Sequence, residues 1–191
     1  KNIGFFAGIE TTMCCEKWID KISDMRKVIV PSFHAKASIQ NAKKFYVLNT
    51  KDNVEVIPEW FPDCFLDKSN NNMHILDNIK TENNVLIIGQ LTKLHPDLDR
   101  KNFINTLKHT LETISLANKS DWGVILKVSI ENNSYLDYLK VKKYITSFVN
   151  IIKKEVKNIP PIYILHGNMT KQELKNLYSN KKVKALATGT R

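Results

Sequence analysis

The sequence lacks the features that mark several classes of protein. Its 191 residues include six glycines and six prolines, too few for a collagen-like or linker-dominated chain. No run approaches the roughly 18 apolar residues of a membrane-spanning helix, so we expect no transmembrane segment, while peripheral membrane contact is left open. The hydrophobic share of 42% in a chain of this length supplies a buried core and predicts one or two folded domains.

Cysteine is also scarce, with three residues at positions Cys14, Cys15 and Cys64. An odd number with an adjacent pair does not make a disulfide framework, and no CxxC spacing indicates zinc, so we expect no metal site. A reducing compartment fits this usage, and the expected location is cytoplasmic. We expect Cys14 and Cys15 to lie in a helix as small apolar residues, whereas a catalytic thiol would need a histidine partner.

Acidic residues are in the minority, since 29 Lys and Arg against 19 Asp and Glu give a formal net charge of +10. The excess is mostly lysine spread along the chain, whereas a nucleic-acid footprint should be clustered. We therefore interpret most of the charge as solvated surface and see no strong nucleic-acid signal. A non-catalytic basic α/β module that binds nucleic acid or a protein partner remains the alternative function.

Apolar runs and helical spacing alternate along the first part of the chain. Strands are predicted at residues 3–6, 28–30 and 54–57. One helix is predicted to start near Thr11, and a second is predicted to run from Phe33 to about Lys44. Thr11 or Thr12 is the expected N-cap of the first helix and Ser32 that of the second.

The same alternation returns in the second part of the chain. Strands are predicted at residues 85–89, 122–128, 162–165 and 183–187, with helices at 100–117, 135–156 and 171–178. Asp99 can cap the first of these helices, and Thr170 with Glu173 forms a capping box for the last. Repeated strand–helix units predict a doubly wound α/β fold with parallel sheets. We place the domains at 1–66 and 80–191, joined by a linker at 67–79 that contains the breaker Ser69 to Asn72.

Ligands of such folds bind outside the carboxyl ends of the strands, which directs attention to the loops that follow them. Arg100 and Lys101 follow a long loop after the strand at 85–89. Two cations beside a helix N-terminus favour an anion such as a pyrophosphate. An ordinary capped helix start is the alternative, because no GxGxxG or Walker glycine pattern is present.

An ordered series of short segments adds a resemblance. The segments are residues 8–12 (GIETT), 18–19 (WI), 28–36 (VIVPSFHAK), 56–61 (VIPEWF), 86–89 (LIIG), 100–102 (RKN), 126–127 (LK) and 166–169 (HGNM). In this order they resemble the retaining glycosyltransferases of family 4, over nearly the whole chain. The resemblance implies the GT-B fold, in which two Rossmann-like domains face each other across a cleft.

The resemblance also implies an activity. Residues 1–66 would be the latter part of the acceptor-side domain, and residues 80–191 the first part of the nucleotide-sugar domain. The expected reaction is transfer of a sugar, with retention, from a nucleotide-diphosphate sugar to an unknown acceptor such as a glycan or a lipid. No metal and no other cofactor is expected.

Particular residues match family positions that contact substrates. Lys101, with Arg100 beside it, matches the position that binds the donor diphosphate. The loop near the donor base is matched by His166, Gly167, Asn168 and Met169. The acceptor-side cleft is matched by Glu10, Thr11, Ser32 and His34.

The sequence departs from the family pattern in several places, and the family's early strands and its Gly-rich loop near the N-terminus are absent from it. Gln90 stands where many members carry a second diphosphate-binding arginine. The segment that bears two donor-binding glutamates in the family would begin where this sequence reaches Arg191, so the catalytic glutamates are expected beyond it. We therefore expect a fragment that lacks both chain ends and is inactive by itself.

Overall fold

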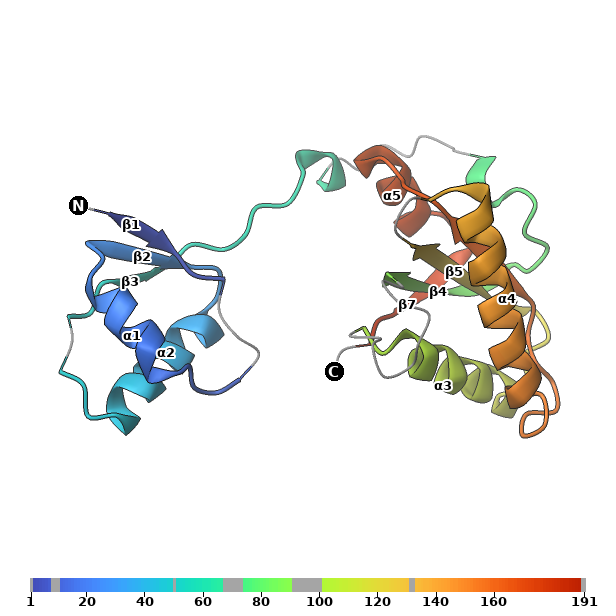
Figure 1. Ribbon diagram of the computed structural model, residues 1–191. Coiled ribbons are helices and arrows are strands. Elements are labelled where there is room, and N and C mark those ends of the chain that lie inside the picture. Colours follow the sequence, from blue (N-terminus) through green and yellow to red (C-terminus); the bar gives the residue numbers. More distant parts are fainter. Residues whose placement is uncertain are drawn as a thin grey trace. The chain divides into compact units, whose positions relative to one another are not determined.

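The computed structural model describes residues 2–7, 11–49, 51–66, 74–90, 101–130 and 133–189. The chain divides into two compact units, unit 1 (Lys1–Phe61) and unit 2 (Pro62–Arg191), and each is described by itself (Figure 1). Within the predicted linker, residues 67–73 lie outside the described residues, and His74–Leu76 forms a short 3-10 helix, η2.

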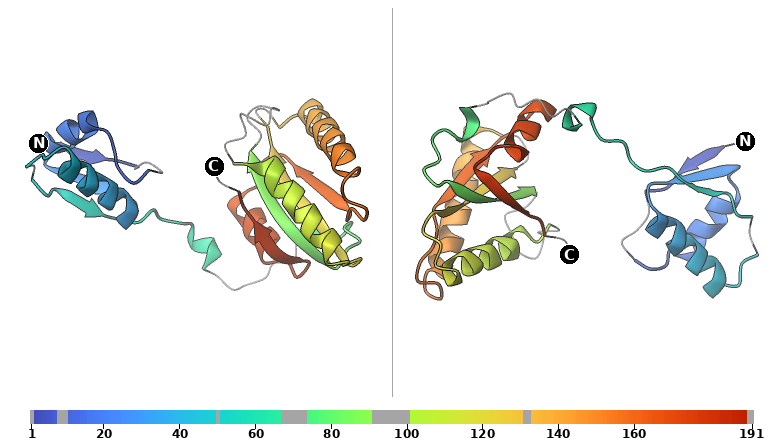
Figure 2. Two further views of the ribbon diagram at one scale, coloured as in Figure 1. Left: turned by 90° about the horizontal axis from the view of Figure 1, so that it is seen from below. Right: turned by 180° about the vertical axis from the view of Figure 1, so that it is seen from behind.

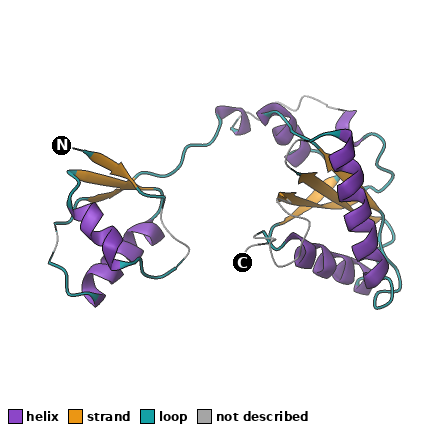
Figure 3. Ribbon diagram, viewed as in Figure 1, coloured by secondary structure: helices purple, strands orange, loops and turns teal. Residues whose placement is uncertain are grey.

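Unit 1 is a three-stranded parallel sheet with two helices (Figure 3). Its elements are β1 (Ile3–Phe5), α1 (Glu16–Ser23), β2 (Lys27–Val30), α2 (Phe33–Phe45) and β3 (Val54–Val56), with strand order β1-β2-β3. Val28 and Val30 of β2 pack with Ile19 of α1 and Ile39 of α2 in one buried cluster. Because successive side chains of a strand point to opposite faces, both helices cover the same face of this sheet.

The other face of this sheet carries exposed apolar side chains. Ile3 and Phe5 of β1 are 65% and 68% exposed. Among the described residues of unit 1, no helix packs on this face. A parallel sheet is ordinarily covered on both faces, whereas unit 1 buries only one face of its sheet.

The start of α1 differs from the prediction. The helix begins at Glu16, so the expected helical positions of Cys14 and Cys15 and the expected caps Thr11 and Thr12 are wrong. The hydroxyl of Thr11 donates to the carbonyl of Met13, a local bond that competes with helix formation, and Cys15 occupies the N-cap position without a side-chain cap. The second cap is confirmed, because Ser32 Oγ accepts a hydrogen bond from the Ala35 N–H at the start of α2.

Unit 2 is a four-stranded parallel sheet with helices. Its elements are η1 (Asp63–Phe65), η2, β4 (Asn83–Gln90), α3 (Phe103–Leu116), β5 (Trp122–Ser129), α4 (Tyr135–Ile152), β6 (Ile162–His166), α5 (Lys171–Tyr178) and β7 (Val183–Ala187). The strand order is β6-β5-β4-β7, and every pair is parallel. The capping box that begins α5, Thr170 with Glu173, is confirmed.

Both faces of this sheet are covered (Figure 2). Leu126 and Val128 of β5 pack in a cluster with α3 and α4, while Ile125 packs in a second cluster with Leu177 of α5 and Leu76 of η2. This burial on two sides explains why β4 and β5 read as continuous apolar runs. It also confirms the predicted fold class, an α/β protein with two Rossmann-like parallel sheets.

Two helix boundaries in unit 2 differ from the prediction. The helix α3 begins at Phe103 and not at Arg100, because Asn102 has a left-handed backbone with φ of 51°. Its side chain accepts a hydrogen bond from Asn105. Asp99 and Arg100, the predicted cap and first helical residue, lie outside the described residues. At the other boundary, α4 ends at Ile152, four residues before the predicted Val156.

Candidate functional site at the carboxyl edge of unit 2

The strand order of unit 2 creates a switch point between β4 and β7. The connections through α3 and α4 run from β4 to β5 and β6, and the connection through α5 returns to place β7 on the other side of β4. In doubly wound folds, ligands bind outside the carboxyl ends of the strands at such a point. The start of α3 and the residues that follow β7 lie at this point.

Gly189 brings these two segments into contact. A Cβ atom at Gly189 would lie 2.3 Å from Thr106 Oγ1 and 2.7 Å from the Lys101 carbonyl oxygen. Only a glycine lets the chain after β7 approach the start of α3 this closely. The turn that contains Lys101 thus lies at the switch point, where the resemblance places the donor diphosphate.

A second glycine fixes the start of α3 against β4. A Cβ atom at Gly89 would lie 2.3 Å from the ring of Phe103, which is 1% exposed. The first residue of α3 thereby packs on the penultimate residue of β4. The positive end of the dipole of α3 and the exposed Lys101 two residues before the helix can together attract an anion.

The predicted base loop lies at the end of β6. His166 is the last residue of this strand and pairs with Val128 of β5. Gly167 follows with a φ of 106°, a conformation that L side chains rarely adopt. The side chain of Asn168 accepts a hydrogen bond of 2.9 Å from Asn133, which precedes α4.

A cavity of about 560 Å³ opens beside this loop. Its lining includes His166, Asn168, Met169, Asn133, Tyr138 and Glu173. His166 Nε2 and Asn133 Oδ1 are buried, and neither has a hydrogen-bond partner among the described residues. The rings of Tyr138 and His166 lie 6.0 Å apart. The cavity thus offers an aromatic surface and unsatisfied polar atoms to a planar, hydrogen-bonding group.

Lys127 is a residue to which sequence reasoning gave no role. It lies in β5 and is only 8% exposed, and its ammonium group donates a hydrogen bond to the carbonyl oxygen of Gly167. Burial lowers the pKa of Lys127 from its ordinary value, because the charged form loses water. The signal that could have found it is a lysine within an otherwise apolar strand, residues 122–129.

The predicted acceptor-side residues belong to unit 1. Ser32 and His34 lie together at the start of α2, where the Ser32 hydroxyl is used as the helix cap. The segment with Thr11 lies beside α2, since Asn41 donates a hydrogen bond of 2.9 Å to the carbonyl of Thr12. Glu10 lies outside the described residues. Three of the four residues therefore lie on or beside one helix.

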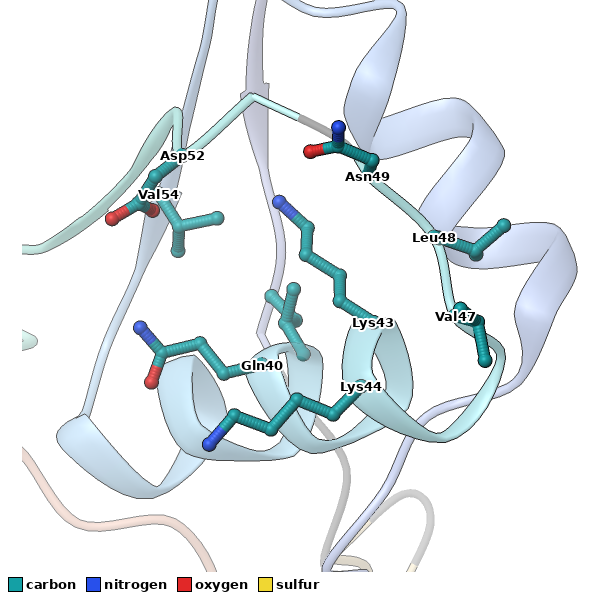
Figure 4. A pocket seen from close by; sticks show the side chains of 9 residues that line it. Gln40, Lys43, Lys44, Val47, Leu48, Asn49, Asp52 and Val54 are labelled. Carbon is teal, nitrogen blue, oxygen red and sulfur yellow. The ribbon is translucent and has the colours of Figure 1, made fainter.

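Unit 1 also has a hollow of about 600 Å³ beside α2 (Figure 4). It is lined by the last turns of α2, including Gln40, Lys43 and Lys44, and by Asp52 and Val54. Asp52 precedes β3 and Val54 is its first residue, so the hollow lies at the amino end of this strand. This is the wrong end of a parallel sheet for the ligands of doubly wound folds. Lys43 moreover donates its hydrogen bond of 2.9 Å to the carbonyl of Lys51.

Two kinds of feature are absent from the part of the chain that the structure describes. No helix there is long and apolar enough to cross a membrane. No group of three or more His, Cys, Asp or Glu side chains there could hold a metal ion.

Comparison with known proteins supports the fold. No protein-family model matches the sequence, and no curated protein matches it. Solved structures do match. The trehalose-6-phosphate structure from E. coli bound with UDP-2-fluoro glucose is 11% identical, with a TM-score of 0.61 over 92% of this chain and 42% of that chain.

Two other solved structures also match most of this chain. A UDP-forming α,α-trehalose-phosphate synthase from Burkholderia xenovorans is 11% identical, with a TM-score of 0.58 over 92% of this chain and 43% of that chain. A trehalose-6-phosphate synthase studied for glycosyl transfer with retention is 10% identical, with a TM-score of 0.54 over 85% of this chain and 40% of that chain. The chain thus has a GT-B-type fold and spans about two fifths of the length of these enzymes.

Proposed function

We propose that this chain is part of a glycosyltransferase that uses a nucleotide-diphosphate sugar. The observation that carries the proposal is the meeting of two segments at the carboxyl edge of unit 2. The start of α3 touches Gly189 at the switch point, and the loop after β6 opens onto a cavity with unsatisfied polar atoms. The fold shared with UDP-forming synthases supports the same conclusion.

Each part of this edge receives a role in the proposal. Lys101, with Arg100 beside it, binds the donor diphosphate through its charge, and the start of α3 adds its dipole. Fixed positive charge at this place also stabilises the diphosphate as it leaves. The loop of His166, Gly167, Asn168 and Met169 holds the base in the cavity beside β6.

The finer points of the proposal rest on the resemblance and on the neighbours. We propose transfer with retention, as studied for one neighbouring synthase, and membership of family 4. No metal takes part in the proposed reaction. Unit 1, with Glu10, Thr11, Ser32 and His34, belongs to the acceptor side, and the acceptor is a glycan, a lipid or another hydroxyl compound. The 191-residue chain by itself transfers no sugar, because the donor-binding glutamates of the family have no counterpart in it.

Calorimetric titration of the chain with UDP-glucose and UDP tests the proposal. We expect binding, and we expect Lys101→Ala to weaken it by roughly tenfold to hundredfold, as for a lost charge-assisted hydrogen bond. Lys119→Ala is the matched control, since Lys119 is an exposed lysine just beyond the other end of α3. It should leave the affinity unchanged.

The titration also separates the proposal from the basic-module alternative. Absence of binding by UDP, GDP and ADP alike would refute the proposed function, since the proposal assigns the base and the diphosphate to residues of this chain. Binding of an oligonucleotide instead, with an affinity that falls steeply as salt is raised, would favour the non-catalytic module.

A further inference from the structure

Lys127 is buried at a position where an apolar side chain would pack with a smaller free-energy cost than a lysine. Its neighbours in β5, Leu126 and Val128, are fully buried in the cluster with α3 and α4. Because side chains alternate along a strand, Lys127 lies on the opposite face, with Ile125. No carboxylate forms a salt bridge with Lys127 among the described residues. Burying an ammonium group without a counter-charge is unfavourable, so packing does not explain a lysine here.

The one described contact of this ammonium group leads to the base loop. Its hydrogen bond runs to the carbonyl oxygen of Gly167, the residue that follows β6. Gly167 has no side chain to hold it, and a Cβ atom there would meet nothing within 4 Å. The next residue, Asn168, is tied by an exposed hydrogen bond to Asn133. The bond from Lys127 is therefore a buried tie between the central strand β5 and this loop.

We propose that Lys127 is a positioning residue for the sugar donor. By holding the Gly167 carbonyl, it fixes the loop from His166 to Met169 at the end of β6 and so orients the groups that line the cavity. This inference rests on the proposed function, because the loop matters for binding only if the cavity receives the base of the donor. Lys127 acts through Gly167, whereas Lys101 acts on the donor itself.

Lys127→Met tests this role, because it keeps the length of the side chain and removes the donor group. We expect the denaturant midpoint of unit 2 to stay the same or rise, since a buried charge is removed. The affinity for UDP should fall about tenfold, in line with a loop that is no longer held in its binding conformation. Hydrogen exchange at the amides of residues 167–169 should become faster.

Two further variants serve as controls. Lys43→Met removes another lysine that donates to a carbonyl group, that of Lys51, and both residues belong to unit 1. It should leave UDP affinity and loop exchange unchanged. Lys127→Arg keeps a cationic donor and should retain affinity within about threefold of wild type.

Each outcome decides the inference. If Lys127→Met stays folded, and binds UDP and exchanges its loop amides as the wild type does, the positioning role is overturned while the proposed function stands. If the wild-type chain binds none of UDP, GDP and ADP, the proposed function fails and the inference falls with it. If Lys127→Met unfolds unit 2, Lys127→Arg decides. Retained affinity supports the role, and a tenfold loss in a folded unit overturns it.

Discussion

The two units repeat the same strand–helix alternation, yet they bury their parallel sheets in different ways. In unit 2, β5 lies between α3 and α4 on one face and α5 with η2 on the other. In unit 1, α1 and α2 cover one face of β2, and the other face shows Ile3 and Phe5 to solvent. The share of apolar residues in the strands is similar in both units. Composition alone therefore does not tell whether helices cover one face of a sheet or both.

The helix starts do not separate the two units in this way. In unit 2, α4 and α5 both begin with complete capping boxes, at Ser134 with Asp137 and at Thr170 with Glu173. In unit 1, Ser32 caps α2, whereas Cys15 at the N-cap position of α1 gives no side-chain cap. Each unit thus contains a helix that begins without a side-chain cap, α1 in unit 1 and α3, at the candidate donor site, in unit 2.

The largest expected difference between the units comes from matched aromatic truncations. Phe103→Ala, at a site 1% exposed, should cost unit 2 about 3–5 kcal/mol of unfolding free energy. Phe5→Ala, at a site 68% exposed, should change unit 1 by no more than about 0.5 kcal/mol.

Tryptophan fluorescence measures the two effects separately. Trp122 is the single tryptophan of unit 2, so a background with Trp18→Phe and Trp60→Phe reports unit 2 alone. A Trp122→Phe background leaves Trp18, which packs edge-on against Phe6, to report unit 1. Equal costs for the two truncations would show that the face with Phe5 is covered after all.

The second comparison concerns the helix caps and predicts effects of opposite sign. Ser134→Ala removes a cap from α4 and should cost unit 2 about 1 kcal/mol. Cys15→Asp supplies the missing cap at α1 and should stabilise unit 1 by a similar amount, about 1 kcal/mol. Cys15→Ala is the control and should be neutral. Denaturant titration in the two tryptophan backgrounds measures both, and a destabilised Cys15→Asp variant would contradict the extended geometry found at this position.

The smallest predicted effect is a dependence of the stability of unit 2 on pH, which arises from the carboxyl groups of its capping boxes. The pKa of Asp137 is lowered by the hydrogen bonds from Ser134, and that of Glu173 by the bonds from Thr170. A carboxyl group whose pKa is lower in the folded state stabilises fully above its unfolded pKa, about 4 for either residue. That stabilisation is lost as the pH falls through the folded pKa.

Melting temperatures of unit 2 between about pH 6 and pH 2 test this dependence. The wild type should lose stability over the acid part of this range more steeply than Asp137→Asn, which has no carboxyl group to protonate. Identical acid profiles for the two proteins would show that the box at α4 contributes nothing.

Much of the fold could be predicted because it depends on local patterns. Ser32 and the box of Thr170 with Glu173 begin their helices as expected, since capping needs only neighbouring residues. The strand at residues 183–187 also has its expected bounds. The start of α1 was missed because Cys14 is held by tertiary contact: its N–H donates to the carbonyl of Ser38 in α2.

The candidate site was predicted in part, for the same physical reason. The end of β6 could be found, because a strand followed by His166 and Gly167 is visible in the sequence. The meeting of Gly189 with the start of α3 could not, since it depends on the order of the strands across the sheet. Lys127 was passed over because its partner, the Gly167 carbonyl, lies 40 residues away along the chain.

The position of β7 beside β4 has a consequence for the order of folding. The partners β4 and β5 are joined by one helix, whereas Asn84 of β4 pairs with Val183 of β7 from the far end of unit 2. Closing a longer loop costs more chain entropy, so β4, β5 and β6 can assemble first and β7 docks last. Until it docks, β4 is an open strand edge and Gly189 has not reached the start of α3. The turn that we propose to bind the diphosphate is therefore completed by the last step of folding, and nucleotide binding should arise later than most of the helical signal.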